Sequence, residues 1–241
     1  AFLQYDRARS VNSLVRSLST DGAEASLTAN YTWTWRYFDS TPFPQRGYGF
    51  GWELGAGYTL AGERRPFGRT TARWLGYWPV GGSIMDMLQK PPTQDSTVNS
   101  APVTGPWGRL VLRAEGGAVW AKRDTPVPET QLFLTGGDAT VRGYGLRNIG
   151  VPQADGGVSP GRYMTAGSVE WQIPIRRNGQ RTAWEAALFV DGGSVAESIP
   201  DLKARYGVGG GVRYNSPVGP LRLDVAYGVQ PRGRRGALPA P

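Results

Sequence analysis

The chain is 241 residues long, which is enough for one large domain or two modest ones. Glycine contributes 35 residues, about twice the usual share, and there are 9 tryptophans and 11 tyrosines. Histidine and cysteine are both absent, which excludes disulfides, zinc–thiolate sites, iron–sulfur clusters and His-containing catalytic triads. The composition therefore argues against most hydrolases, and we expect neither enzymatic activity nor a metal or cofactor site.

The net charge of +8 comes almost entirely from arginine, since lysine occurs only at positions 90, 122 and 203. A basic chain can bind nucleic acid, but here the arginines are spread through the alternating segments described below. We therefore predict no nucleic-acid partner. No apolar run approaches the ~18 residues that a transmembrane helix needs, which leaves strands as the elements that could cross a membrane.

Apolar and polar residues alternate with a period of two through most of the chain. In segment 24–37 every second residue from Ala25 to Tyr37 is apolar, while the alternates from Glu24 to Arg36 are polar. Many such segments run ~9–13 residues, longer than the ~5–6 of soluble strands and suited to a tilted bilayer crossing. The alternation predicts about nine strands, at 1–7, 24–37, 49–60, 69–78, 109–121, 163–175, 183–191, 205–215 and 221–229.

The charged residues fall on one face of these predicted strands. Glu53, Arg113 and Arg213 are typical, since each occupies the polar alternates, whereas tryptophans and tyrosines gather on the apolar alternates near strand ends. A membrane barrel turns its apolar alternates to lipid and carries aromatic girdles at both interfaces. The pattern predicts an all-β fold, an antiparallel transmembrane β-barrel with its charges in the lumen. A soluble Gly-rich β-sandwich is the alternative.

The predicted connections differ greatly in length. Residues 176–182 and 216–220 form short turns, whereas the connection at about 122–162 is far longer than an ordinary hairpin loop. A second long connection, at about 79–106, is rich in Pro, Ser and Thr, and we interpret it as a flexible insertion. The glycines within 207–211 lie inside a strand, so they favour a thinner sheet or close approach of another backbone over a phosphate-binding loop.

The 122–162 connection contains the Gly-rich run LTGGDATVRGY. Its glycines permit positive φ angles and close backbone approach, which predicts a tightly folded loop. An arginine held in such a loop is expected to pair with a carboxylate, and two acidic residues on later lumen-facing positions are candidates; a solvent-exposed arginine is the alternative. The candidate residues are Gly136, Gly137, Val141, Arg142, Gly143 and Tyr144 in the loop, with Glu170 and Asp191 as the acidic partners.

Four segments together resemble the BamA/TamA superfamily of outer-membrane protein assembly barrels, the bacterial surface antigen family. They are Leu134–Tyr144, Ser168–Pro174, Phe189–Gly193 and Ser216–Tyr227, which occur in the family's order and at compatible spacings. Pro44–Tyr48 also resembles the family's Pro-x-Arg-Gly turn. The resemblance covers Tyr31 to about Gly228, and around Phe133–Tyr144 and Tyr206–Tyr227 it is closest to the TamA branch, the barrel subunit of the translocation and assembly module.

The resemblance implies a sixteen-stranded barrel, preceded by periplasmic POTRA domains, in the outer membrane of a Gram-negative bacterium. It also implies that the long loop folds into the lumen, where Arg142 contacts Glu170 and Asp191 on the next two strands. Family members fold client outer-membrane proteins through a seam between the first and last strands. TamA-like members work with the inner-membrane-anchored protein TamB and are linked to autotransporter assembly and phospholipid transport. The implied partners are therefore the lipid bilayer, client proteins and a TamB-like protein.

The chain departs from this family pattern in three respects. It contains no POTRA region, and about nine strands is fewer than sixteen and odd for a bacterial barrel. The residues after Tyr227 continue as PRGRRG, without the aromatic-ended final strand of the family. We therefore expect residues 1–241 to be a barrel fragment from the C-terminal two-thirds, without either seam strand.

Three functions are compatible with these observations. The first is an insertion and assembly barrel of TamA type. The second is a related barrel, either BamA-like or a two-partner secretion pore that exports a dedicated client. The third is a passive porin, which the ordered motifs argue against. Paired carboxylates also suit glycosidases, but nothing in the sequence marks a nucleophile and no histidine is present to act as a base.

Overall fold

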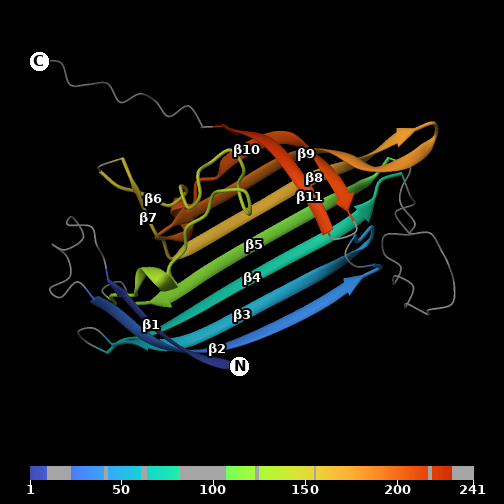
Figure 1. Ribbon diagram of the computed structural model, residues 1–241. Coiled ribbons are helices and arrows are strands. Elements are labelled where there is room, and N and C mark those ends of the chain that lie inside the picture. Colours follow the sequence, from blue (N-terminus) through green and yellow to red (C-terminus); the bar gives the residue numbers. More distant parts are fainter. Residues whose placement is uncertain are drawn as a thin grey trace, which may run out of the picture.

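A computed structural model describes residues 1–9, 23–40, 43–60, 64–81, 107–122, 125–154, 156–216 and 219–229 of the chain. Nine long strands dominate it (Figure 1). They are β1 (Phe2–Arg9), β2 (Ala23–Phe38), β3 (Gly47–Thr59), β4 (Pro66–Pro79), β5 (Arg109–Ala121), β8 (Tyr163–Arg177), β9 (Gln180–Ala196), β10 (Arg205–Ser216) and β11 (Gly219–Val229). The predicted number of strands is confirmed.

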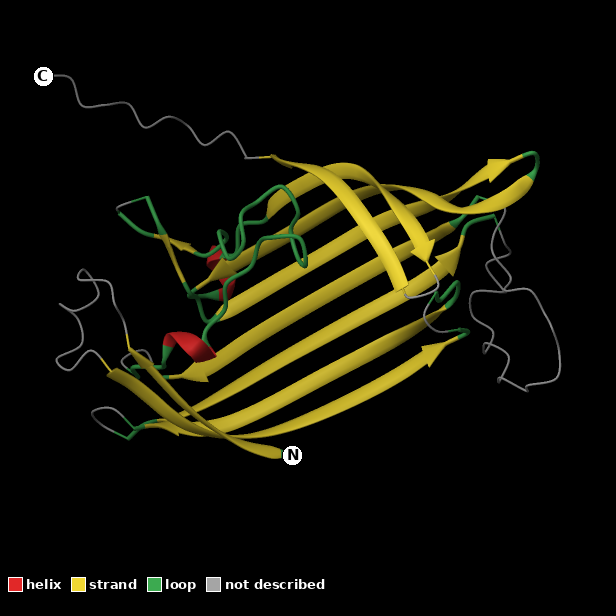
Figure 2. Ribbon diagram, viewed as in Figure 1, coloured by secondary structure: helices red, strands yellow, loops and turns green. Residues whose placement is uncertain are grey.

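All nine strands form one antiparallel sheet in the order β1-β2-β3-β4-β5-β8-β9-β10-β11, so every strand pairs with its neighbours in sequence. The sheet is strongly curved, and the connection between β5 and β8 lies on its concave side (Figures 1 and 2). Its two edges are β1 and β11, which do not pair with each other within the described residues. The predicted all-β, antiparallel barrel architecture is therefore confirmed as a curved sheet that is not closed.

The convex face of the sheet is apolar. Large hydrophobic side chains that point outward remain exposed on every long strand except β4, with Leu54, Leu188 and Val225 as examples. The inward alternates are instead small or polar, and many are buried, as are Thr28 and Asn30 on β2. Because an exposed apolar face is unfavourable in water and favourable in lipid, this polarity is the one expected of a membrane-spanning sheet.

Aromatic rings concentrate on the convex face toward the ends of the strands that join at the short turns. Trp33 and Trp35 at the end of β2 pack edge-to-face against Phe50 and Tyr48 at the start of β3, with ring centroids 6.0 and 6.1 Å apart. On the other side of the sheet, Trp184 and Tyr214 lie 4.8 Å apart between β9 and β10. Rings that are apolar yet carry a polar edge favour the membrane interface, so these pairs mark the boundary of the hydrocarbon layer.

Local chemistry explains the tight connections. The turn between β8 and β9 is Asn178-Gly179, and both residues have positive φ angles (52° and 77°), as a two-residue hairpin requires. Gly47 opens β3 at φ 125°, where an added Cβ would lie 2.1 Å from the carbonyl oxygen of Tyr37. Only glycine fits there, which explains the Pro-x-Arg-Gly turn.

Two features of the sequence interpretation need comment. Strand β9 extends to Ala196, five residues beyond the predicted end. The alternation of apolar and polar residues did not reveal this extension, because residues 193–196 are all buried under the long loop and do not alternate in polarity. The predicted flexible insertion at about 79–106 lies almost wholly outside the described residues. The described helices are two 3-10 turns, η2 (Glu129–Gln131) and η3 (Ile199–Asp201), and no helix in the described ranges is long and apolar enough to span a membrane.

Candidate functional site in the barrel interior

The long loop between β5 and β8 folds back into the concave side of the sheet (Figure 2). Two antiparallel bridges, Phe133 to Gly161 and Thr135 to Ile149, hold its two arms together. A short hairpin of β6 (Val151–Pro152) and β7 (Val158–Ser159) extends from it. The base of the loop is anchored by a buried hydrophobic cluster of Phe67, Val119, Val127, Phe133, Met164 and Val195.

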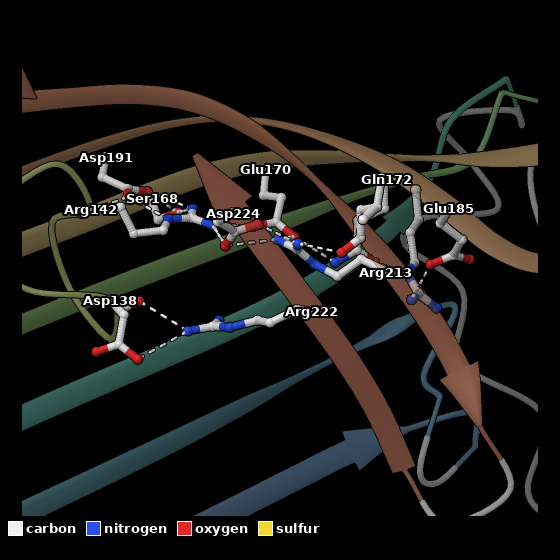
Figure 3. A network of polar contacts seen from close by, with 12 residues as sticks. Asp138, Arg142, Ser168, Glu170, Gln172, Glu185, Asp191, Arg213, Arg222 and Asp224 are labelled. Carbon is white, nitrogen blue, oxygen red and sulfur yellow. Dashed lines mark hydrogen bonds and ion pairs between the residues drawn. The ribbon is translucent and has the colours of Figure 1, made fainter. Parts of the chain in front are cut away.

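Arg142 at the loop tip is the centre of a buried ion-pair network (Figure 3). Its Nε and Nη2 donate to the two carboxylate oxygens of Asp191 at 2.7 and 2.8 Å, and its backbone N–H donates to the same carboxylate at 3.0 Å. Its Nη1 donates to Glu170 at 2.6 Å. The structure thus brings together the three charged residues that the sequence analysis selected.

The environment of Arg142 strengthens these contacts. Its side chain is 3% exposed and that of Asp191 is 0% exposed, so little water competes for the hydrogen bonds. The guanidinium carbon lies 3.3 Å from the centre of the Phe189 ring, which adds a cation–π contact. Burial disfavours the charged form of Arg142, but hydrogen bonds to Asp191 and Glu170 outweigh this effect and raise the pKa of the guanidinium. Arg142 therefore stays charged.

Two members of the network were not selected from the sequence. Asp224 on β11 accepts a hydrogen bond from Nη1 of Arg142 at 3.2 Å and pairs with Arg213 on β10. Arg213 also donates to Glu170 at 2.9 Å, so that each arginine contacts two or more acids. Both residues occupy polar alternates of their strands, and Asp224 belongs to one of the four family-like segments. Strand parity could therefore have identified them as candidates.

The network continues along the interior of the sheet toward the short turns. Gln172 donates to Glu170 at 2.7 Å and accepts from Arg109 at 2.6 Å. Arg109 in turn donates to Glu185 at 3.1 Å and to the backbone carbonyl of Pro44 at 2.8 Å. One chain of charge-assisted hydrogen bonds thus links the loop tip to the turn between β2 and β3.

Glycines allow the loop to approach the sheet at backbone distance. Gly136, Gly137 and Gly143 have φ angles of 105°, 103° and 91°, which other residues rarely adopt. A Cβ on Gly143 would lie 2.5 Å from the backbone nitrogen of Gly228 on β11. A Cβ on Gly207 of β10 would lie 1.9 Å from the carbonyl oxygen of Arg142. Of the two roles expected for the β10 glycines, close approach of another backbone is the one observed at Gly207.

The remaining two residues of the loop motif fix the tip against the sheet. Val141 is fully buried, and its side chain fills the space above Gly193 of β9. The hydroxyl of Tyr144 donates to the carbonyl oxygen of Val229 at the end of β11 at 3.0 Å. The loop motif therefore holds the edge strand β11 as well as the strands named in the sequence analysis.

The same loop also contacts the opposite edge of the sheet. The side-chain amide of Gln131 in η2 donates to Asp6 on β1, and the backbone carbonyl of Gln131 accepts a hydrogen bond from Arg69 on β4 at 3.1 Å. Arg69 is held in place by Glu53 at 2.8 Å. One loop consequently connects the first and last strands of the described sheet across its hollow face.

The sequence matches the Omp85 superfamily domain over residues 3–235, nearly the whole chain. The chain belongs to the Omp85 superfamily. An outer-membrane-type β-barrel is therefore supported both by the family and by the polarity of the sheet.

Individual relatives agree with this assignment. Over 137 residues the chain is 33% identical to outer envelope protein 80, chloroplastic, of Arabidopsis thaliana, and the match covers 52% of this chain and 16% of that protein. The fold is similar to the crystal structure of BamA from Haemophilus ducreyi lacking POTRA domains 1–3, with a TM-score of 0.64 and 19% identity. That match covers 95% of this chain and 47% of the BamA chain. The chain thus spans less than half of either relative.

The concave side of this Omp85 sheet holds two features, the ion-pair network around Arg142 and a cavity beside the loop tip. Within the described residues, no group of three or more acidic side chains is placed to hold a metal ion. A cavity of about 560 Å³ lies beside the loop tip, lined in part by Arg36, Arg73 and Arg113 and by the loop residues Ala139 and Thr140. The arrangement is suited to fixing a loop in the lumen and, through that loop, to setting the positions of the edge strands.

Proposed function

We propose that this protein is an assembly barrel of TamA type, which inserts autotransporters or other β-barrel proteins into the outer membrane of a Gram-negative bacterium. The observation that supports the proposal is the loop that crosses the interior and joins β1 to β11 through Gln131 and the Arg142 network. A passive pore has no need of an internal loop that braces distant strands. An assembly barrel does, because this part of its wall must keep its shape while the sheet opens elsewhere for a client.

The proposed activity involves no bond making or breaking, so the protein is proposed not to be an enzyme. The groups at the site are arginines and carboxylates that satisfy one another by hydrogen bonds. Proposed partners are the bilayer, client outer-membrane proteins and an inner-membrane-anchored protein of the TamB kind. The proposed assignment to the TamA branch rests on the resemblance of the amino-acid sequence at residues 133–144 and 206–227.

The test uses the full-length protein reconstituted in liposomes and challenged with an urea-unfolded autotransporter β-domain. We expect insertion, measured by the heat-modifiable gel mobility of the client, to be faster than in empty liposomes. Arg142→Ala should remove most of this acceleration while the protein remains in the membrane. Arg73→Ala is the matched control, because Arg73 is a mostly exposed lumen arginine whose ion pair within the described residues is with Glu115.

The other family activities give different results in the same system. A two-partner secretion pore would release its soluble client into the liposome lumen without inserting any barrel. A porin would pass small solutes without changing client insertion. A BamA-like barrel would insert many unrelated clients equally well. No acceleration of any client by the full-length protein would contradict the proposed assembly function.

A further inference from the structure

The cavity beside the loop tip lies over a part of β3 that presents no side chains to the concave face. Gly49 and Gly51 occupy two successive inward positions of this strand, and both line the cavity. A Cβ added at Gly51 would meet no atom within 4 Å, so the space above it is open. The cavity measures about 560 Å³, which is the size of sites that bind small molecules.

Two arginines stand on either side of these glycines. Arg36 on β2 pairs with Gly49, and Leu75 on β4 pairs with Gly49 from the other side. Leu75 in turn pairs with Arg113 on β5. The two arginines therefore occupy one row across the sheet, three strand spacings or about 14 Å apart at the backbone, and both line the cavity between them.

The charges that line the cavity are not balanced. Arg73 and Glu115 form an ion pair at 3.1 Å and compensate each other. Arg113 donates through Nη1 to the backbone carbonyl of Ala139 at 2.9 Å, a neutral acceptor that leaves the positive charge uncompensated. Arg36 is exposed and forms no hydrogen bond or ion pair within the described residues. Two positive charges therefore remain in a concave site, where they attract anions.

Much of the remaining lining is apolar. Phe38, Leu75 and Ala166 contribute hydrocarbon surface to the cavity. A bare inorganic anion would leave this surface in contact with water, whereas an organic anion would cover it and gain from its burial. The two uncompensated charges match a ligand with two negative groups, one for each arginine.

We propose that this cavity binds a small organic dianion that carries two carboxylates on an apolar body. One carboxylate pairs with Arg36 and the other with Arg113, while the body rests on Gly51 and Leu75. A guanidinium has five N–H donors in a planar fork that matches a carboxylate, and the contact with Ala139 uses only Nη1 of Arg113. The site does not depend on the proposed assembly activity.

The test uses the full-length protein in a non-ionic detergent, with 5-fluoroisophthalate, a benzene ring with two carboxylates, as the probe. We expect saturable broadening of its fluorine NMR signal, and no such broadening with the uncharged diamide of the same ring. Arg36→Gln and Arg113→Gln should each weaken binding about fivefold, which corresponds to about 1 kcal/mol, the upper range for an exposed ion pair. Because Arg36 is exposed and unpaired within the described ranges, its replacement should leave the fold intact.

Two further variants separate the cavity from general charge. The pair Lys122→Gln, Lys203→Gln removes two charges from exposed residues beside the long-loop ends of β5 and β10, and it should bind the probe like the unchanged protein. Gly51→Leu keeps every charge but fills the space between the arginines, so it should weaken binding at least about fivefold, as much as the loss of one arginine.

Several outcomes would overturn the proposal. Equal broadening of the diamide would show that charge is not recognised, and equal loss in the lysine pair would reduce the effect to net charge. Unchanged binding in both Arg36→Gln and Gly51→Leu would place the probe elsewhere. Displacement of the probe by an equal concentration of inorganic phosphate would show that the apolar body contributes nothing. No broadening of the probe signal would show that the cavity is closed to solutes in the full-length protein.

Discussion

At the scale of single residues, geometry matters more than charge in the interior network. Asp191 is fully buried and accepts three hydrogen bonds from Arg142. Glu170 accepts one hydrogen bond from Arg142. Asp224 also accepts one, which is longer, and it pairs with Arg213 as well. The contribution of each acid should follow this order. An ammonium group at position 142 keeps the charge but lacks the planar fork that serves Asp191 and Glu170 together.

We therefore expect Arg142→Lys to lower the free energy of unfolding of the full-length protein by about 1–3 kcal/mol, because hydrogen bonds to buried charges are lost. Arg73→Lys should change it by less than about 0.5 kcal/mol, since the Arg73 side chain is 73% exposed and its pair with Glu115 is screened. Thermal unfolding in detergent measures both. A double-mutant cycle of Arg142→Ala with Asp191→Ala that shows simple additivity would contradict the assigned contact.

A second residue-scale prediction concerns the glycines of the interior. Gly207→Ala would place a Cβ 1.9 Å from the carbonyl oxygen of Arg142, so the loop tip must move or the strand must bend. The expected cost is about 1–3 kcal/mol, as for other overpacked positions, with faster proteolysis of the loop. Gly51→Ala is the control, because its added Cβ meets nothing within 4 Å. Equal protease resistance of the two variants would argue against close packing of the loop.

At the scale of elements, the loop acts as an internal strap with separate attachments to the two edges of the sheet. Gln131 holds β1 through Asp6, while Tyr144 holds the end of β11 through the carbonyl of Val229. Amides exchange more readily where fewer contacts hold a strand in place, so the loss of an attachment should be felt mainly in the strand that it holds. The two attachments should therefore be separable by experiment.

Hydrogen exchange of the full-length protein provides the measurement. We expect Gln131→Ala to speed exchange in β1 by a few-fold and leave β11 unchanged, and Tyr144→Phe to do the reverse, because each removes one hydrogen bond of about 1 kcal/mol. Each variant is the control for the other. If both variants loosened both edges equally, the loop would act as one cooperative unit and not as two attachments.

At the scale of the whole molecule, the polarity of the curved sheet determines its solvent. Outward residues such as Leu188, which is 55% exposed, can be accommodated only by lipid or detergent. Leu188 lies midway between Trp184 and Gly192, the partner of Tyr206, and so near the centre of the hydrocarbon layer. A charge at such a depth is costly in a membrane barrel.

We expect Leu188→Arg to lower the stability of the full-length barrel in lipid vesicles by about 2–4 kcal/mol, while Leu188→Met should cost less than about 1.5 kcal/mol because it conserves volume and polarity. Urea titration with a heat-modifiability readout on gels gives both values. Stability that is the same for both variants would mean that Leu188 does not face lipid.

Much of this architecture was determined by the sequence alone. The number of strands and the face on which each side chain lies are local properties, because successive residues of a strand point to opposite sides. The alternation along residues 24–37 therefore identified the lipid face without any tertiary contact. Short sequence motifs that resemble those of the family also identified the loop glycines and the three charged residues Arg142, Glu170 and Asp191.

Only the tertiary structure decided which side chains meet. Asp224 lies 82 residues from Arg142, and Asp6 lies 125 residues from Gln131, and periodicity carries no information about such separations. Their contact depends on the register of each strand pair and on the path of the loop across the concave face. The alternation in polarity places both Asp6 and Asp224 on the interior face of the sheet. The path of the loop then brings Gln131 to Asp6 and Arg142 to Asp224, so that one segment contacts both edges of the described sheet.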